Sequence, residues 1–397
     1  WNLYFLARII HDVRSMCPWL LSILDSFMAR HLDALSRELN CRMHAAWSFA
    51  LKHMMDTDPF RYAADALDAC LQAREFDFRD IDFDLWVLNL YHEGAFRIWQ
   101  LHADYRDNLE KSIACSMELL EALDGPEWQK LRRAVHNNLG MTYDRRVVGN
   151  RADNIEQALQ HYRKALEIAR EEGVEGRFPS IINNLGYIYR MRIRGDKAEN
   201  IETAIRYLQR AWELHHAAGN RMHSAQTLTN LGVAYCDRLM GDHRENLYTA
   251  IRYYRRALRI LDRETYPGFR AWTLHNLGVA WHFLAADTGG NPLERAIACY
   301  EEALTIRRPD QMPMDWLLTT RNLSRAYSVR NRGDISANRR KALALLEGTM
   351  DVVPPQKHLM EWAQTHVYHG IVHGRQVDGG IRDHLESAAE CFRTALT

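Results

Sequence analysis

The sequence predicts an all-α solenoid of antiparallel helix pairs, and three periodic features support this prediction. A small residue inside a helical pattern returns every 46 residues, a second series of small residues follows at the same period, and a Gly-Asp turn separates the two series. Such self-similarity is typical of stacked units, because each unit buries its apolar face only against its neighbours. We therefore expect about seven 46-residue repeats, preceded by a helical region in which the pattern is degenerate.

The first series marks the first helix of each unit. Around one member, Leu185, Gly186 and Tyr189 lie about one turn apart, as a buried helix face requires. A glycine inside a helix costs about 1 kcal/mol relative to alanine, so the close approach of another helix is expected to compensate. We expect these residues to lie at contacts between neighbouring helix pairs. The series is Gly94, Gly140, Gly186, Gly232, Gly278, Ser324 and Gly370.

The second series marks the second helix of each unit. Ala204 and Ala211 stand seven residues apart on one face, with the bulky Tyr207 and Leu208 between them. Small side chains on one helix accept large ones from another, which favours an antiparallel pair. The series is Ser112, Ala158, Ala204, Ala250, Ala296, Ala342 and Ala388.

Glycine and asparagine signals predict the turn between the two helices. The glycines suit the left-handed residue that ends a helix, and the asparagines are expected to cap the helix that follows. A phosphate or calcium loop is disfavoured, since dense glycines and alternating carboxylates are missing. The glycines are Gly149, Gly195, Gly241, Gly333 and Gly379, and the asparagines are Asn108, Asn154, Asn200, Asn246 and Asn338.

The period divides the chain into residues 1–84 and 85–397. The first part carries amphipathic helical patterns and is predicted to be an N-terminal cap of degenerate repeats, with a docking element for a partner as the alternative. The second part is the array, which we expect to continue into a further domain, because the last unit shows no polar cap. Its units lie near 85–130, 131–176, 177–222, 223–268, 269–314, 315–360 and 361–397.

Composition narrows the function classes. Lys and Arg total 51, Asp and Glu also total 51, and the net charge is zero, which disfavours a nucleic-acid or membrane surface. Seven cysteines without a Cys-x-x-Cys pair fit a reducing compartment. The longest stretch without a charged residue, 271–286, is shorter than the ~20 residues that a membrane span needs. We expect a cytoplasmic protein without a cofactor.

The motif Leu139-Gly140-x-x-Tyr143, followed by Ala158-x-x-x-Tyr162-x-x-Ala165, resembles the tetratricopeptide repeat (TPR). That repeat usually has about 34 residues. The longer form found here looks like the repeats of proteins that carry a C-terminal CHAT domain, a caspase-like cysteine peptidase module. The resemblance implies a right-handed superhelix whose first helices line a concave groove that binds proteins or peptides. No peptidase segment is present in this sequence, so we expect no catalytic residue within it.

An asparagine ladder stands two residues before each glycine of the first series, in the groove that the resemblance implies. Asparagine is a poor helix former, so its recurrence needs a reason. The amides could form hydrogen bonds with the backbone of an extended peptide, or they could form hydrogen bonds with the neighbouring repeat and so stabilise the stacking of the repeats. The ladder is Asn138, Asn184, Asn230, Asn276 and Asn322, and the other predicted groove residues are Tyr187, Arg190, His275, Arg321 and Arg325.

A histidine trio occupies one face of the first helix in the last unit. His366, His369 and His373 follow i, i+3, i+7 spacing, and two histidines four residues apart can share a zinc ion, with Cys391 as a further ligand. A packed contact with an adjacent domain is the alternative, and we favour it, so no metal site is predicted.

The most consistent function is a protein–protein interaction scaffold. The resemblance makes it the sensor or regulatory arm of a larger effector, such as a CHAT-type caspase-like protease, with that effector domain as an intramolecular partner. A free-standing scaffold or adaptor is the alternative. An arginine rim at the turns could meet an acidic partner or RNA, but neighbouring acids are expected to neutralise it. The rim is Arg192, Arg194, Arg238, Arg330 and Arg332.

Overall fold

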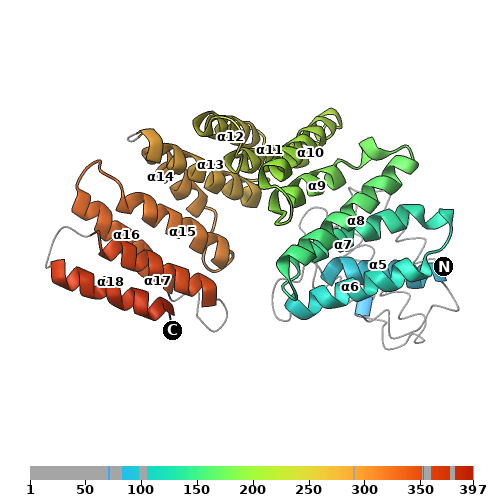
Figure 1. The fold of residues 1–397 in the computed structure, drawn as a ribbon, viewed down its shortest axis with the longest axis horizontal. Coiled ribbons are helices and arrows are strands. Elements are labelled where there is room, and N and C mark those ends of the chain that lie inside the picture. Colours follow the sequence, from blue (N-terminus) through green and yellow to red (C-terminus); the bar gives the residue numbers. More distant parts are fainter. Residues whose placement is uncertain are drawn as a thin grey trace, which may run out of the picture. The chain divides into compact units, whose positions relative to one another are not determined.

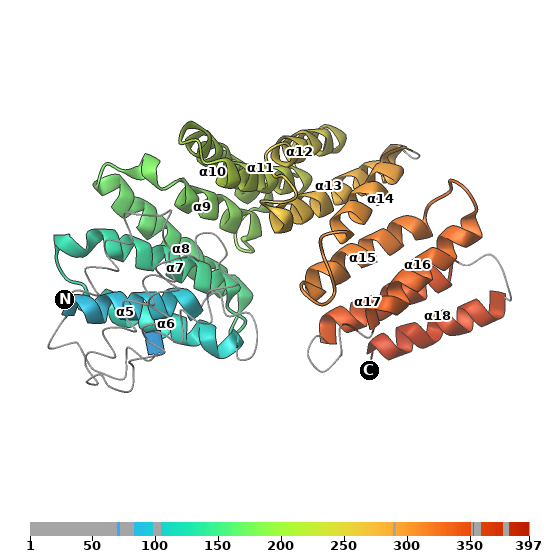
Figure 2. The same ribbon diagram turned by 180° about the vertical axis from the view of Figure 1, so that it is seen from behind.

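The computed structural model describes residues 70–71, 83–97, 105–288, 291–350, 352, 359–375 and 381–396. Within these ranges the regular elements are all helical, as the sequence predicts (Figures 1 and 2). The predicted N-terminal cap at 1–84 falls almost entirely outside them. The chain forms two compact units, 1–195 and 196–397.

The N-terminal unit contains α5 (Phe83–Arg97), α6 (Tyr105–Ala122), α7 (Gln129–Arg145), α8 (Arg151–Glu171) and α9 (Pro179–Met191), with short 3-10 turns at Pro126–Trp128 and Glu175–Arg177. α5 packs on α6 and α7 packs on α8, and the pairs connect through α6 against α7 and α8 against α9. Each pair therefore stacks on the next along the chain.

The C-terminal unit begins with α10 (Lys197–Ala217) and continues with four helix pairs. These are α11 (Arg221–Cys236) with α12 (His243–Leu258), α13 (Pro267–Thr288) with α14 (Asn291–Leu304), α15 (Pro313–Ser328) with α16 (Ile335–Met350), and α17 (Leu359–His373) with α18 (Ile381–Leu396). The first helices of successive pairs also touch, α11 on α13, α13 on α15 and α15 on α17, so they form a continuous layer within this unit (Figure 1).

The glycine series lies inside the helix pairs. A Cβ added to Gly140 would stand 2.6 Å from the ring of Tyr162, and one added to Gly232 would stand 2.4 Å from the ring of Tyr254. Gly278 meets Tyr300 in the same way, at 2.5 Å. Each tyrosine belongs to the second helix of the same pair. The expectation of contacts between neighbouring pairs was therefore wrong: the glycine makes room for a buried ring within its own pair.

Two serines show how closely the helices of a pair approach each other. The Ser112 hydroxyl donates to the carbonyl of Gly94 over 2.8 Å, and the Ser324 hydroxyl donates to the carbonyl of Ala342 over the same distance. Each bond joins the two small-residue series across one pair. Ala158, Ala204, Ala250, Ala296 and Ala342 are fully buried; Gly186 lies buried in α9 and Gly370 in α17, whereas Ala388 lies in α18 with its side chain outside the description.

The turn glycines have the expected left-handed backbone but not the expected position. Gly149, Gly195, Gly241 and Gly333 have φ between 78° and 80°. Each precedes the residue that caps the second helix and does not directly follow the last residue of the first. Gly379 lies outside the described residues.

The caps are Asn150, Asp196 and Asp242, each of which accepts a bond from a backbone N–H of the first helical turn. The predicted capping asparagines have a different role: Asn154, Asn200 and Asn246 stand four residues after these caps and are buried, as is Asn338. The side chain of Asn246 reaches back over the turn, and its Nδ2 donates to the carbonyls of Met240 and Arg238. Asn154 and Asn338 bond their own turns in the same way. Asn108 accepts instead from Arg97, and Asn200 is buried.

Candidate binding face on the first helices

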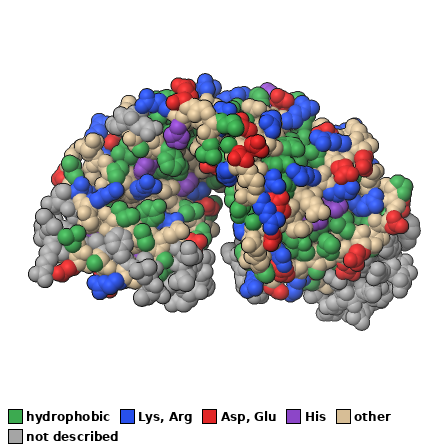
Figure 3. Space-filling view, viewed as in Figure 1, with side chains coloured by type: hydrophobic (Ala, Val, Ile, Leu, Met, Phe, Trp, Pro, Cys, Tyr) green, Lys and Arg blue, Asp and Glu red, His purple; other side chains and the backbone are tan. Residues whose placement is uncertain are grey.

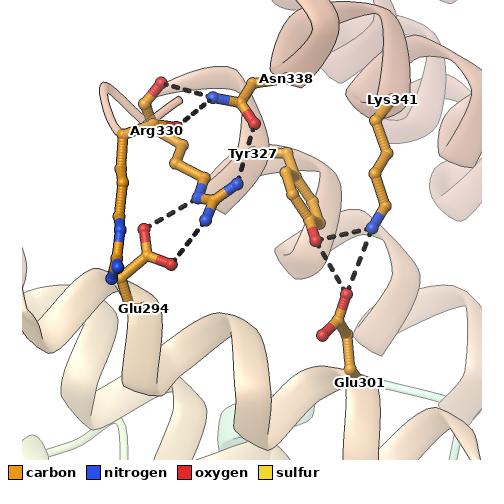
Figure 4. Close-up of polar contacts among 7 residues, drawn as sticks. Glu294, Glu301, Tyr327, Arg330, Asn338 and Lys341 are labelled. Carbon is orange, nitrogen blue, oxygen red and sulfur yellow. Dashed lines mark hydrogen bonds and ion pairs between the residues drawn. The ribbon is translucent and has the colours of Figure 1, made fainter. Parts of the chain in front are cut away.

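The arginine rim is tied into a repeated bracket (Figure 4). The guanidinium of Arg330 donates two bonds of 2.8 Å to the carboxylate of Glu294, which belongs to the preceding pair, and a third bond of 3.1 Å to Asn338. The same two-pronged contact joins Arg146 to Glu110, Arg192 to Glu156 and Arg238 to Glu202. Arg194 likewise pairs with Asp153. The rim is therefore largely neutralised, as the sequence analysis expected.

Electrostatics reinforce this bracket. Hydrogen bonding from Arg146, Arg192 and Arg330 lowers the pKa of the glutamates that they contact, Glu110, Glu156 and Glu294. A second contact lies beside the last bracket: Tyr327 donates to Glu301 over 2.8 Å, and Lys341 donates to the Tyr327 hydroxyl over 2.6 Å (Figure 4). These residues connect helix pairs and leave little free charge at the turns. On the face drawn in Figure 3, basic and acidic side chains are interspersed.

The asparagine ladder makes several kinds of contact. Asn184 donates to Asn137 of the preceding pair over 3.2 Å, and Asn322 lies 3.5 Å from Nε2 of His275, also in the preceding pair. Asn276 instead bonds the carbonyl of Trp272 in its own helix. Asn230 is buried, and Asn138 is partly buried. At Asn184 and Asn322, the amides therefore bond the neighbouring repeat.

The other predicted groove residues divide between the two units. Tyr187 and Arg190 lie in α9, with the guanidinium over the ring at 5.5 Å from its centroid. In the C-terminal unit, His275 contacts the Thr319 hydroxyl at 3.1 Å, and burial lowers its pKa to about 3. Arg321 is 7% exposed and donates to Gln364 of the next pair over 3.1 Å. Arg325 alone among these three is exposed.

Two adjoining hollows lie on the first-helix layer of the C-terminal unit. The larger, about 550 Å³, is lined by α15, α17 and the residue Arg375 that follows α17. The smaller, about 310 Å³, is lined by the end of α13, α14, the end of α15 and the same Arg375. Arg325 and Arg375 line both hollows, so they connect the two into one surface.

This surface combines exposed apolar side chains with unpaired positive charge. Within the described residues, neither Arg325 nor Arg375 forms an ion pair, and the guanidinium of Arg375 donates to the Ser328 hydroxyl over 3.0 Å. The exposed fractions of the four apolar side chains range from 37% to 47%. We call this surface the binding face; it consists of Phe283, Arg325, Val329, Val367, Ile371 and Arg375.

Sequence reasoning found only one residue of this face, Arg325. Val367 and Ile371 stand one turn apart on α17, and their exposure was the missing information, because an apolar residue in a helical pattern reads as core. Arg375 lies just past the end of α17, at the register position that Val329 and Phe283 hold in the two preceding pairs, and this position belongs to none of the recurring series.

The histidine trio is split by the structure. The ring of His366 contacts Trp362, at 4.3 Å between ring centroids. His369 and His373 point toward α18, where the Sγ of Cys391 lies 3.2 Å from Nδ1 of His369. The trio therefore does not act as one group.

Comparisons with known proteins agree with this architecture. A model of the Sel1 repeat matches residues 135–167, 182–216 and 225–259, and each match covers parts of two consecutive helices. The search of curated proteins gives no match.

Similar folds occur among solved structures. A Rap protein complexed with competence and sporulation factor is 14% identical, with a TM-score of 0.57 over 90% of this chain and 96% of that chain. Aspartyl phosphate phosphatase F from Bacillus subtilis is 12% identical, with a TM-score of 0.50 over 100% and 91%. A chain of the APC/C hetero-tetramer Cut9-Hcn1 is 15% identical, with a TM-score of 0.50 over 88% and 56%. At these identities the likeness is one of fold. Three segments of the chain thus match the Sel1 repeat model, and the fold is an all-α, TPR-like solenoid of helix pairs.

Proposed function

We propose that this protein is a protein–protein interaction scaffold, and that the binding face of the C-terminal unit holds a segment of its partner. The observation that carries the proposal is the pair of arginines, Arg325 and Arg375, set between exposed apolar side chains in a hollowed surface. An exposed apolar patch with a polar rim is typical of an interaction site. The Rap structure that shares the fold holds competence and sporulation factor in complex, which supports a binding role.

The chemistry of the face defines the partner. Guanidinium groups without an acidic neighbour favour a carboxylate, and Arg binds a carboxylate in two-pronged fashion. Val367, Ile371 and Phe283 offer apolar surface on either side of the arginines. The expected ligand is an extended or helical peptide segment that carries an acidic group beside large apolar side chains.

Selection from a displayed random peptide library tests this proposal. The wild-type chain should enrich peptides that combine Asp or Glu with large apolar residues. In fluorescence anisotropy with a selected peptide, the double variant Arg325→Glu/Arg375→Glu should bind at least about 100-fold more weakly, which corresponds to about 1.4 kcal/mol for each charge. The affinity should also fall as salt rises.

A matched control separates specific contact from general charge. Arg259 is exposed at the end of α12, away from the face, so Arg259→Glu makes the same kind of charge change elsewhere. It should leave the affinity unchanged. Enrichment of basic peptides, or equal binding by the double variant and the wild type, would refute the proposal.

The residues described here support binding and offer no set of groups for catalysis, so we propose a non-enzymatic role for them. We further propose, from the long repeat motif alone, that the array is the sensor arm of a larger effector such as a CHAT-type protease. Sequencing of the reading frame beyond Thr397 tests this proposal. A CHAT module encoded after the array would support it, and a stop codon soon after Thr397 would favour the free-standing adaptor instead.

Among the described residues, every helix is too short or too polar to span a bilayer. Burial raises the pKa of the Cys236 and Cys299 thiols to about 12, which keeps both protonated and inert. Cys236, Cys299 and Cys391 form no disulfide among the described residues, as is usual in a reducing compartment, and this supports our proposal of a cytoplasmic location, which imaging of the tagged protein would test.

A further inference from the structure

Three potential metal ligands meet between the last two helices. His369 and His373 lie four residues apart on one face of α17, and α18 returns antiparallel to bring Cys391 against them. One ligand atom from each residue lies within 4.8 Å of the other two. The two imidazole rings stand 4.6 Å apart, edge to face.

The repeat register shows how unusual this cluster is. In the preceding pair, the three equivalent positions hold Leu323, Tyr327 and Leu345, which pack as apolar contacts. The last pair replaces all three with residues that bind metals; cysteine also stands at the third position in two earlier pairs, as Cys115 and Cys299, so the two histidines are the unusual change. A buried polar group costs free energy unless it has a partner, so packing alone does not account for the change.

The imidazole of His369 is buried, and its hydrogen-bonding capacity is not fully satisfied by the described residues. Its side chain is 8% exposed, and its Nε2 is buried without a hydrogen-bond partner among the described residues. Nδ1 faces Cys391, while Nε2 lies 4.0 Å from the carboxylate of Glu347 on α16. In metal sites the second imidazole nitrogen usually donates to a carboxylate. Nδ1 is therefore the nitrogen that is offered to the metal, and Glu347 is the candidate acceptor for Nε2, although 4.0 Å is longer than a hydrogen bond.

We propose that His369, His373 and Cys391 bind one Zn²⁺ ion between α17 and α18. Two imidazole nitrogens and one thiolate suit Zn²⁺, which favours four-coordinate N and S ligation. On binding, the Cys391 thiol releases its proton to solvent and a Zn–S bond forms, with no change of oxidation state. The fourth position is left for water or for a ligand from a partner.

The test uses the full chain without a polyhistidine tag. Titration with Co²⁺, a spectroscopic substitute for Zn²⁺, should give one equivalent of binding and a thiolate-to-cobalt charge-transfer band. Cys391→Ser should abolish the band. Cys299→Ser is the matched control, because Cys299 occupies the equivalent register position two pairs earlier, and it should keep the band.

Zinc affinity, measured by competition with a chromophoric chelator, should fall on His373→Ala by more than the ~10–100-fold that loss of an outer partner costs. His366→Ala removes a histidine from the same helix outside the cluster and should change nothing. Equal binding by Cys391→Ser and the wild type, or equal loss in the His366 and His373 variants, would overturn the proposal.

A second variant guards against simple unfolding. His369→Leu restores the residue that earlier pairs place at this position, so it should fold at least as well as the wild type in the absence of metal. It should nevertheless lose the zinc-dependent rise in Tm that the wild type shows. A rise in Tm that persists in this variant would also contradict the site.

Discussion

The contact between Gly232 and Tyr254 offers the sharpest test of how the helix pairs are built. A Cβ at position 232 would lie 2.4 Å from the Tyr254 ring, well inside van der Waals contact. Tyr254 is 1% exposed, so its ring has no space into which it can turn. We predict that Gly232→Ala destabilises the C-terminal unit.

The magnitude follows from two opposed effects. Alanine in place of glycine gains about 1 kcal/mol of helix propensity. Overpacking against a rigid buried ring costs about 3 kcal/mol, at the upper end of the usual range. The net loss should be about 2 kcal/mol in the free energy of unfolding.

Gly94 provides the matched control within the same series. A Cβ there would meet Cys115 and Ser116 at 3.4 Å, which is ordinary contact. Gly94→Ala should therefore stabilise its unit by about 0.5–1 kcal/mol. The same substitution at equivalent positions thus has opposite signs, depending only on the side chain opposite.

The assay is urea unfolding, with hydrogen exchange of the helix amides to assign each effect to its own pair, because repeat arrays need not unfold in one step. The double variant Gly232→Ala/Tyr254→Leu should lose less free energy of unfolding than the two single variants lose together, by at least about 1 kcal/mol. The α15–α16 pair already has this combination, because Ser324 takes the place of the glycine and Leu346 takes the place of the tyrosine. Stabilisation by Gly232→Ala, or additivity in the double variant, would refute the reasoning.

Three further predictions concern the bracket and the buried polar groups. Arg238→Leu breaks the two-pronged pair with Glu202 and should lower the free energy of unfolding by about 1 kcal/mol, and by less at high salt. The control Arg210→Leu removes an exposed ion pair and should lower it by less than about 0.5 kcal/mol. Urea titrations at two salt concentrations measure both changes. Asn246→Ala leaves two turn carbonyls without their donor and should cost about 1–3 kcal/mol by the same assay, with its hydrogen-exchange effect confined to that turn. His275 has a pKa of about 3 in the folded chain against 6.5 in the unfolded one, so the unfolded state binds more protons below pH 6.5 and stability falls as pH drops from 6.5 toward 3. His275→Gln should flatten the measured dependence of unfolding free energy on pH by up to one proton, and an unchanged slope would contradict this assignment.

The repeat period was sufficient to predict the helix pairs, but it assigned the contacts of the glycine series to neighbouring pairs, whereas they lie within each pair. It failed where the side-chain role depended on a turn whose path is not encoded by periodicity. Asn246 looked like a cap because it stands near the start of a helix, yet Asp242 takes that role and Asn246 bonds the turn behind it. Residue type was compatible with both roles, and only the backbone path distinguishes them.

The second-helix ends show a similar limit. Gly173 and Gly219 have φ of 67°, and the residues after them donate to the carbonyls of Ala169 and His215. These are the left-handed helix ends that the sequence analysis assigned to Gly149 and its equivalents. The two series share the 46-residue period, so period alone could not tell a helix end from a turn.

The residues that depart from the repeat are the ones with proposed functions, and this has a physical basis. Positions that hold the pairs together must satisfy packing, so they return at each period as small residues or as apolar and aromatic ones that fill the space opposite them. A position can change to a costly residue only where something other than packing compensates. His369 and His373 replace apolar core residues without a complete set of protein partners for His369, and exposed Phe283 leaves apolar surface in water. In an array whose stability is spread over near-identical contacts, one pair can carry such a cost while its neighbours supply the fold. Functional residues are therefore best sought at positions where the 46-residue repeat continues but a polar or charged side chain replaces the apolar residue that packing requires.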